Sequence, residues 1–260
     1  MCNKLKYLGV VGLLLIVSQY IYALPLIPWS NPEGVERLQR SQHKVDFFKL
    51  ANNFESQSNG IYCGPTTAVI VLNALRLTSG KVMVPKDYSV LNESERQYLP
   101  NSYDATYKRY TQRNFFSIRG KKLKDKMSVL GKPREDGKQD FGFQLRQYNE
   151  LLKAHRLKTK MQIVDEKIDE KEIKKEIIAN LSRANDYVII NYQRKALGQE
   201  GGGHISPLAA YDEKSDSFLI LDVTPNKAPW VWVSAMDLIA AMRTFDTNEN
   251  RGYILVEDTL

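Results

Sequence analysis

The chain has 260 residues, of which 43% are hydrophobic and 10% aromatic, the composition of an ordinary globular protein with one sizeable core. Its formal net charge is +7, but lysine and arginine are mixed with acidic residues, as in residues 167–175, and do not form a basic stripe. Composition and charge therefore give no support to a nucleic-acid-binding protein.

The N-terminus has the order of a secretory signal peptide. Two lysines give a positive start, residues 7–17 are almost wholly apolar, and the small residue Ala23 closes the segment. The alternative is an uncleaved membrane anchor, but the apolar run is well short of the roughly 20 residues that a spanning helix needs. We therefore expect a signal peptide over 1–23, one domain over 24–260, export to the periplasm or the medium, and no stable membrane association after cleavage.

The cysteine count follows from this expectation. Cleavage would remove Cys2, so that Cys63 would be the single cysteine of the mature chain. Exported proteins usually use cysteines in disulfide pairs, so an unpaired one is either a small buried hydrophobic residue or a functional thiol. The neighbours of Cys63 favour the second interpretation.

Helices are predicted in the first two thirds of the chain. Residues 24–59 are expected to be rich in loops, because three prolines break their start. Residues 63–75 have apolar side chains near helical spacing and predict a buried helix. Residues 77–103 are polar and turn-rich, which indicates a surface insertion, and amphipathic helices are predicted over 143–157 and 168–181.

From residue 187 the pattern is typical of strands. The expected strands are short and rich in β-branched and aromatic residues, and they lie at 187–190, 204–211, 218–223, 230–233 and 253–256. A glycine-rich loop at 198–203 precedes the second of them. Helices followed by an antiparallel sheet predict a single α+β domain in two lobes.

Cys63 stands where a predicted helix begins, and this position suits a nucleophile. A helix N-terminus and a nearby imidazole stabilise a thiolate, and the unused backbone N–H of the first turn can donate to an oxyanion. Gln57, six residues earlier, is the candidate for a second donor, at a spacing found in papain-like cysteine enzymes.

The candidate base is His204, one of three histidines. His43 and His155 lie in polar or charged stretches and are expected to face solvent. His204 follows three glycines, where the bare backbone lets a substrate approach closely. The alternative is a core histidine without a catalytic role.

The candidate for the orienting acid is Asp222. If residues 207–223 form a hairpin about the turn at Glu213, Asp222 falls roughly opposite His204 on one face, where paired side chains lie about 5 Å apart at Cβ. A buried carboxylate needs a partner, and an imidazolium would serve. The alternative is an aspartate that only caps a turn.

These features resemble the phytochelatin synthase family in its short bacterial form. The matching segments include residues 59–75, 110–116, 188–211 and 218–233. The resemblance implies a papain-like fold, with the nucleophile at the start of a central helix and the histidine and aspartate on an antiparallel sheet. It also implies that Cys63, His204 and Asp222 attack the Cys–Gly bond of glutathione through a γ-glutamylcysteinyl thioester, with Gln57 in the oxyanion hole.

The resemblance implies substrate-binding residues as well. Arg251, and more weakly Asn191, would bind the γ-glutamyl end of glutathione. Tyr62, Arg194 and Asp246 match parts of the acceptor site for a second glutathione.

One part of that acceptor site departs from the family pattern. Pro225 and Ala228 stand where the family usually has an arginine and an aromatic residue. We therefore expect mainly hydrolysis to γ-glutamylcysteine and glycine, with slow phytochelatin synthesis. No tightly bound cofactor is expected; cadmium or zinc would enter as glutathione thiolate complexes. The oligomeric state stays open, with a homodimer as one option.

Two functions of other classes stay open from the residues alone. A generic papain-like peptidase would cleave ordinary peptides and would hardly need Arg251. A non-catalytic metal- or thiol-binding protein is disfavoured, because one mature cysteine and three scattered histidines lack the four suitably spaced ligands of a closed metal site.

Overall fold

The computed structural model describes residues 25–89, 91–116 and 123–259. The predicted signal peptide at 1–23 lies outside the described residues, so this segment and the domain boundary after it stay predictions. Within the described ranges, no helix combines the length and the apolar character needed to span a membrane.

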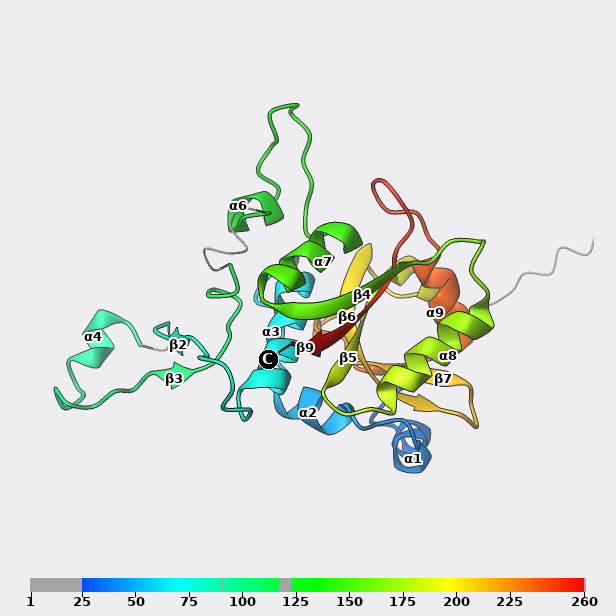
Figure 1. Cartoon of the computed structure of the whole chain (residues 1–260), viewed down its shortest axis with the longest axis horizontal. Coiled ribbons are helices and arrows are strands. Elements are labelled where there is room, and N and C mark those ends of the chain that lie inside the picture. Colours follow the sequence, from blue (N-terminus) through cyan, green and yellow to red (C-terminus); the bar gives the residue numbers. More distant parts are fainter. Residues whose placement is uncertain (1–24, 90, 117–122, 260) are drawn as a thin grey trace, which may run out of the picture.

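One antiparallel sheet of seven strands forms the centre of the molecule (Figure 1). Its strands, in spatial order, are β1 (Ile27–Pro28), β8 (Val231–Ser234), β7 (Ser217–Ile220), β6 (Gly203–Asp212), β5 (Asp186–Gln193), β9 (Gly252–Asp258) and β4 (Leu157–Ile163). The five predicted strands are confirmed as β5 to β9. β4 was not predicted, because the lysines at positions 158 and 160 give this edge strand the polarity of a surface loop.

Apolar side chains cover both faces of the sheet. In β5, Tyr187 and Ile189 belong to one buried cluster, and Val188 and Ile190 belong to the other. The first cluster includes residues of α3 (Cys63–Arg76) and α7 (Leu145–Ala154), and the second includes residues of α8 (Glu170–Leu181) and α9 (Ala235–Met242). A strand buried on both faces has an unbroken apolar run, which is the pattern of residues 187–190. The chain is therefore a mixed α/β protein with an antiparallel sheet.

The central helix α3 confirms the predicted buried helix. Every residue from Gly64 to Arg76 is buried, as expected for a helix that is apolar on nearly all sides. The hydroxyl of Tyr148 in α7 donates a hydrogen bond to the carbonyl oxygen of Gly64 at 2.9 Å. Packing thus fixes the start of the helix, which is the position of Cys63.

Residues 25–59 contain long loops, as expected, but also two helices that were not predicted. α1 spans Pro32–Arg40 and α2 spans Phe47–Asn52. Proline breaks a helix interior but suits the first helical position, where its missing N–H is not needed. Pro32 occupies that position, and the Asn31 side chain accepts a hydrogen bond from the backbone N–H of Gly34 at 2.6 Å.

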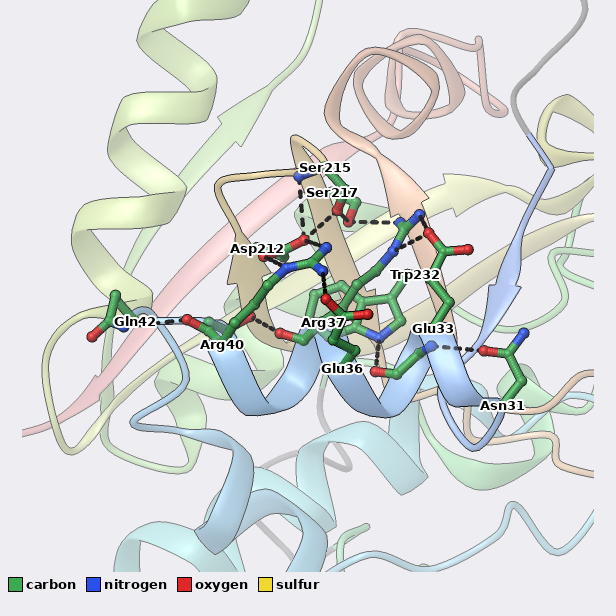
Figure 2. Close-up of polar contacts among 12 residues, drawn as sticks. Asn31, Glu33, Glu36, Arg37, Arg40, Gln42, Asp212, Ser215, Ser217 and Trp232 are labelled. Carbon is green, nitrogen blue, oxygen red and sulfur yellow. Dashed lines mark hydrogen bonds and ion pairs between the residues drawn. The ribbon is translucent and has the colours of Figure 1, made fainter.

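Helix α1 is attached to the hairpin formed by β6 and β7 (Figure 2). Arg40 donates two hydrogen bonds to the buried carboxylate of Asp212, at 2.9 and 2.6 Å. Arg37 donates to the hydroxyl of Ser217 at 3.1 Å, and the indole of Trp232 donates to the carbonyl of Gly34 at 3.0 Å. These contacts hold the end of the β6–β7 hairpin where the turn lies. His204 lies at the opposite end of β6.

The predicted surface insertion projects from the α3 side of the body (Figure 1). It contains β2 (Lys86–Asp87) and α4 (Glu93–Arg96). The strand β3 (Tyr107–Lys108) follows shortly after the predicted end of the insertion and pairs with β2. The predicted amphipathic helices are confirmed as α7 and α8, each of which begins two residues later than expected. Helix α9 was not predicted.

Candidate active site

Cys63 is the first residue of α3 and lies half-buried at the edge of a cavity. Burial by itself raises the pKa of the thiol. A hydrogen bond from His204, its positive charge, and the backbone N–H groups of Ile205 and Gly64 outweigh burial, so the pKa of Cys63 lies below its usual value. These contacts favour the thiolate, which is the nucleophilic form of cysteine.

His204 lies near the start of β6, buried beside Cys63. Its Nε2 atom is 3.1 Å from Oδ1 of Asp222, which leaves Nδ1 as the ring nitrogen that serves the thiol. Burial lowers the pKa of an imidazole, but the hydrogen bonds and negative charges of Asp222 and Cys63 raise that of His204 above its usual value. The arrangement therefore stabilises a thiolate–imidazolium pair.

Asp222 is fully buried and holds four contacts. Its Oδ1 atom accepts the backbone N–H of Thr224 at 2.8 Å and faces His204 and Arg194, and its Oδ2 atom accepts the hydroxyl of Tyr192 at 3.3 Å. Burial raises the pKa of this carboxyl, but the bond from His204 and the nearby cations lower it below its usual value. Asp222 is thus an ionised partner for the imidazolium.

The expected hairpin register was wrong, although the two residues meet. Strand β7 ends at Ile220, which pairs with Leu208, and a bulge shifts the pairing between Leu208 and Ala210. Asp222 therefore lies in the segment after the strand and not directly across from His204. The contact comes from that segment bending back, with the backbone of Leu221 donating to the carbonyl of Pro207 at 3.1 Å.

Gln57 connects the acid segment with the loop before the nucleophile. Its side-chain oxygen accepts the hydroxyl of Thr224 at 2.7 Å, and its backbone N–H donates to the carbonyl of Val223 at 2.9 Å. Its Nε2 atom donates to the carbonyl of Asn59 at 2.7 Å, which uses one of its two N–H groups. The role of Gln57 as oxyanion donor stays a prediction.

The cavity beside Cys63 has a volume of about 240 Å³, and both apolar and polar side chains line it. Its apolar lining, Ile61, Phe141 and Phe143, is called the apolar wall below, and its polar lining, Asn191, Asp246 and Arg251, is called the polar wall. The thiol of Cys63 and the ring of His204 line the same cavity. Such a cavity suits a small ligand with a charged end and a less polar middle.

Arg251 is buried at the polar wall, although sequence reasoning without the resemblance would place it on the surface. Its Nη1 atom donates to the carbonyl of Phe245 at 2.6 Å, and Nη2 contacts Oδ1 of Asp246 at 3.1 Å. Its Nε atom and Oδ1 of Asn191 are buried and have no hydrogen-bond partner among the described residues. A Cβ at Gly203 would lie 2.9 Å from Nη2 of Arg251, so a side chain at this position would require the guanidinium to shift.

The structure brings together some of the predicted substrate-binding residues and separates others. Asn191, Asp246 and Arg251 share the cavity with the nucleophile. Tyr62 is buried before α3 with its ring 5.8 Å from that of Phe116, and Arg194 is buried beside Asp222. Neither of these two lines the cavity.

His155 was expected to face solvent, and this was wrong. It is buried at the end of α7, where its ring stacks on Phe115 with centroids 4.9 Å apart, and Nε2 contacts the carbonyl of Phe115 at 3.0 Å. It is a core histidine and does not line the cavity.

Sequence reasoning did not find the apolar wall or the partners of Asp222. Phe141 and Phe143 come from a segment about 80 residues after Cys63, and nothing in their local pattern connects them to it. Tyr192 could have been found, because it pairs directly with His204 across β5 and β6. In the ranges that the structure describes, no group of three or more His, Cys, Asp or Glu side chains could hold a metal ion.

Comparison with known proteins adds independent findings. A family model described as "Phytochelatin synthase" matches residues 18–253. The chain is 28% identical over 242 residues to "Glutathione gamma-glutamylcysteinyltransferase 3" of Lotus japonicus, covering 89% of this chain and 42% of that protein. It is 25% identical over 214 residues to "Glutathione gamma-glutamylcysteinyltransferase" of Schizosaccharomyces pombe, covering 82% and 43%. The chain spans less than half the length of these curated relatives.

Proposed function

The chain belongs to the phytochelatin synthase family, and we propose that it cleaves the Cys–Gly bond of glutathione with Cys63, His204 and Asp222 as catalytic triad. One observation carries the proposal: the Cys63 thiol, which lies beside the imidazole of His204, and the buried guanidinium of Arg251 line the same small cavity. The names of the relatives describe transfer of a γ-glutamylcysteinyl group of glutathione, which is the acyl group that this reaction forms.

In the first half-reaction the Cys63 thiolate attacks the carbonyl carbon of the cysteine residue of glutathione. The negative charge that develops on the carbonyl oxygen would be stabilised by the backbone N–H of Cys63, in the first turn of α3, and by the free N–H of Gln57. His204 gives its proton to the leaving nitrogen, so that glycine departs as an amine and a γ-glutamylcysteinyl thioester remains on Cys63.

The polar wall of the cavity would bind the γ-glutamyl end. The α-carboxylate of that end suits the guanidinium of Arg251, whose Nε is otherwise unpaired, and its α-ammonium suits Asp246 or Oδ1 of Asn191. The sequence resemblance assigned Asp246 to the acceptor site, but its position beside Arg251 supports a place at the donor site. The apolar wall would face the cysteine side chain.

In the second half-reaction water would attack the thioester while His204 accepts its proton, which gives γ-glutamylcysteine and restores the thiol. We propose that hydrolysis exceeds peptide synthesis, because Pro225 and Ala228 replace side chains expected at the acceptor site. When a second glutathione is the acceptor, cadmium or zinc would arrive as part of a thiolate complex of the substrate. We also propose that the protein is exported, on the pattern of residues 1–23.

A papain-like organisation is part of the same proposal. It is supported by α3, which begins at the nucleophile, and by its packing against the antiparallel sheet that carries the base.

The test is a mass-spectrometric time course of the purified protein with glutathione, run beside Cys63→Ser. The wild type should release glycine and γ-glutamylcysteine in equal amounts, and Cys63→Ser should release neither. His43→Gln is the matched control, because His43 bonds Ser182 and Glu213 away from the cavity, and the variant should keep both products. If the wild type leaves glutathione intact but cleaves ordinary α-linked peptides, the chain is a generic cysteine peptidase. Faster formation of phytochelatin than of γ-glutamylcysteine with cadmium would refute the preference for hydrolysis.

A further inference from the structure

We propose that Arg194 is a positioning residue of the triad, which holds Asp222 against the imidazole of His204, and not a residue whose main task is to bind the acceptor. The inference rests on the proposed triad and concerns a side chain that does not line the substrate cavity. In this role the buried positive charge of Arg194 helps to align Cys63 with His204 and to keep the pair ionised.

Arg194 is built into the turn that leads to the catalytic histidine. It is the first residue of the short helix η1 (Arg194–Leu197), directly after β5, and only 2% of it is exposed. Its backbone N–H donates to the carbonyl of Gly202, and its carbonyl accepts the N–H of Gln199, both at 3.0 Å. A Cβ at Gly201, which has a φ of +113°, would lie 3.2 Å from Cδ of Arg194. The glycine-rich loop before His204 therefore folds closely around this side chain.

The guanidinium forms a compact triangle with the acid and the base. Nη2 of Arg194 lies 2.5 Å from Oδ1 of Asp222 and 3.0 Å from Nε2 of His204, and these two atoms are 3.1 Å apart. A guanidinium can only donate hydrogen bonds, so in the thiolate–imidazolium state Arg194 and His204 both donate to the same carboxylate oxygen. Arg194 thus fixes the oxygen that in turn orients the ring of His204 toward Cys63.

The positive charge also acts on the titration of the pair. In a buried site a cation makes each nearby proton easier to lose, because charges interact strongly where water is excluded. Arg194 lowers the pKa of Asp222 and so favours its ionised form, and Asp222 in turn holds the imidazolium that stabilises the thiolate of Cys63. Tyr192 of β5 and Tyr148 of α7 also face the pair, but their pKa values are raised well above the usual range by burial, so both stay neutral.

The contacts of Arg194 leave little of it for a second glutathione. Nη2 is taken by Asp222, and Arg194 does not line the substrate cavity. Nη1, which is buried and has no hydrogen-bond partner among the residues that the structure describes, is the part of the guanidinium left for another ligand. The two roles give different results. A positioning residue affects glycine release and synthesis in parallel, whereas an acceptor-binding residue affects synthesis alone.

The first test measures the rate of Cys63 alkylation by iodoacetamide against pH, without glutathione. The rate rises with pH as the thiolate of Cys63 forms, and this rise is the acid limb of the profile. Arg194→Gln should move the acid limb to higher pH by about one unit, because a nearby positive charge is lost. Arg194→Lys keeps the charge and should keep the limb near its wild-type pH. Lys195→Gln removes a charge from the next, exposed residue of the same turn and should leave the profile unchanged.

The second test measures steady-state glycine release from glutathione. Arg194→Gln should lower kcat at least about tenfold with little change in KM, since the cation acts through Asp222 and His204 and not on the substrate. If Arg194→Gln does not fold, as judged by circular dichroism, Arg194→Lys should still lower kcat, because an ammonium cannot hold both neighbours as a planar fork does. Wild-type alkylation profiles and wild-type kcat in the folded variants, with only phytochelatin synthesis lost, would overturn the proposal in favour of acceptor binding. The alkylation result stands even if the protein does not act on glutathione, so the two proposals can fail separately.

Discussion

Replacing His204 with alanine should lower kcat for glycine release from glutathione by about a thousandfold or more, the largest loss expected after removal of Cys63 itself. His204 has two tasks in the proposed reaction. It stabilises the thiolate of Cys63, and it gives the proton without which glycine is a poor leaving group. Its Nε2 is held by Asp222 at 3.1 Å, which leaves Nδ1 for the thiol.

The pH dependence of the wild type follows from the same pair. The pKa of Cys63 lies below its usual value and that of His204 above its usual value, and both shifts favour the thiolate–imidazolium form that the proposed reaction uses. We expect kcat/KM to be highest in the pH range where this form is most populated. It should fall as pH drops through the pKa of Cys63, because the thiolate is protonated, and as pH rises through the pKa of His204, because the imidazolium loses its proton.

The measurement is the alkylation rate of Cys63 at pH 6 together with glycine release. His204→Ala should slow both, because without the imidazole the pKa of the thiol rises and less thiolate is present. His43→Gln is the matched control: His43 bonds Ser182 and Glu213, away from the cavity, and the substitution should leave both rates near wild type. A His204→Ala protein that alkylates at the wild-type rate would show that the thiolate does not depend on the imidazole.

Replacing Arg251 with methionine should lower kcat/KM for glutathione roughly a hundredfold or more, mainly through KM. Truncating one partner of a buried, hydrogen-bonded charge contact typically costs about 2–5 kcal/mol, and every 1.4 kcal/mol is about a tenfold change. Arg251 is buried on the cavity that holds Cys63, and its Nε, which has no hydrogen-bond partner in the described ranges, is the atom proposed to bind the γ-glutamyl carboxylate. kcat should change little, because the contact is made equally in the ground state and the transition state.

The control and the competing function are tested in the same assay. Arg134→Met removes an exposed guanidinium that pairs with Asp136, and it should leave kcat/KM unchanged. A generic cysteine peptidase would not need a cation for a γ-linked carboxylate, so unchanged kinetics in folded Arg251→Met would favour that alternative. Thermal unfolding of each variant separates loss of binding from loss of structure, since burial of Arg251 with Asp246 also contributes to the fold.

The parts of the fold that could be predicted are those whose pattern is local. The β-branched and aromatic residues at 187–190 predict a strand, and the apolar spacing of 63–75 predicts a buried helix, each from its local pattern. Helix α1 was missed, because a proline can either break a helix or begin one. Pro32 begins a helix here, and the side chain of Asn31 caps that helix. Strand β4 was missed as well, because its alternating lysines resemble a surface loop.

The candidate site divides in the same way. Cys63 and His204 stand out through their neighbours in the chain, a helix start and three glycines. Arg251 could be proposed only from the resemblance, since its burial depends on Gly203 and on the loop at Asp246. Phe141 and Phe143 reach the cavity through tertiary packing alone, which no spacing in one sequence encodes. The bulge between Leu208 and Ala210 likewise changed the register that a simple hairpin predicts.

The central claim is that glutathione acylates Cys63, and rapid acid quenching tests it most directly. The protein would be mixed with glutathione, quenched within the first turnover, and its intact mass and proteolytic peptides measured. We predict that one γ-glutamylcysteinyl group is found on the peptide that contains Cys63, that hydroxylamine removes it, and that it is absent from Cys63→Ser. Glycine release without any acylated protein, or a label on another residue, would contradict the proposed mechanism.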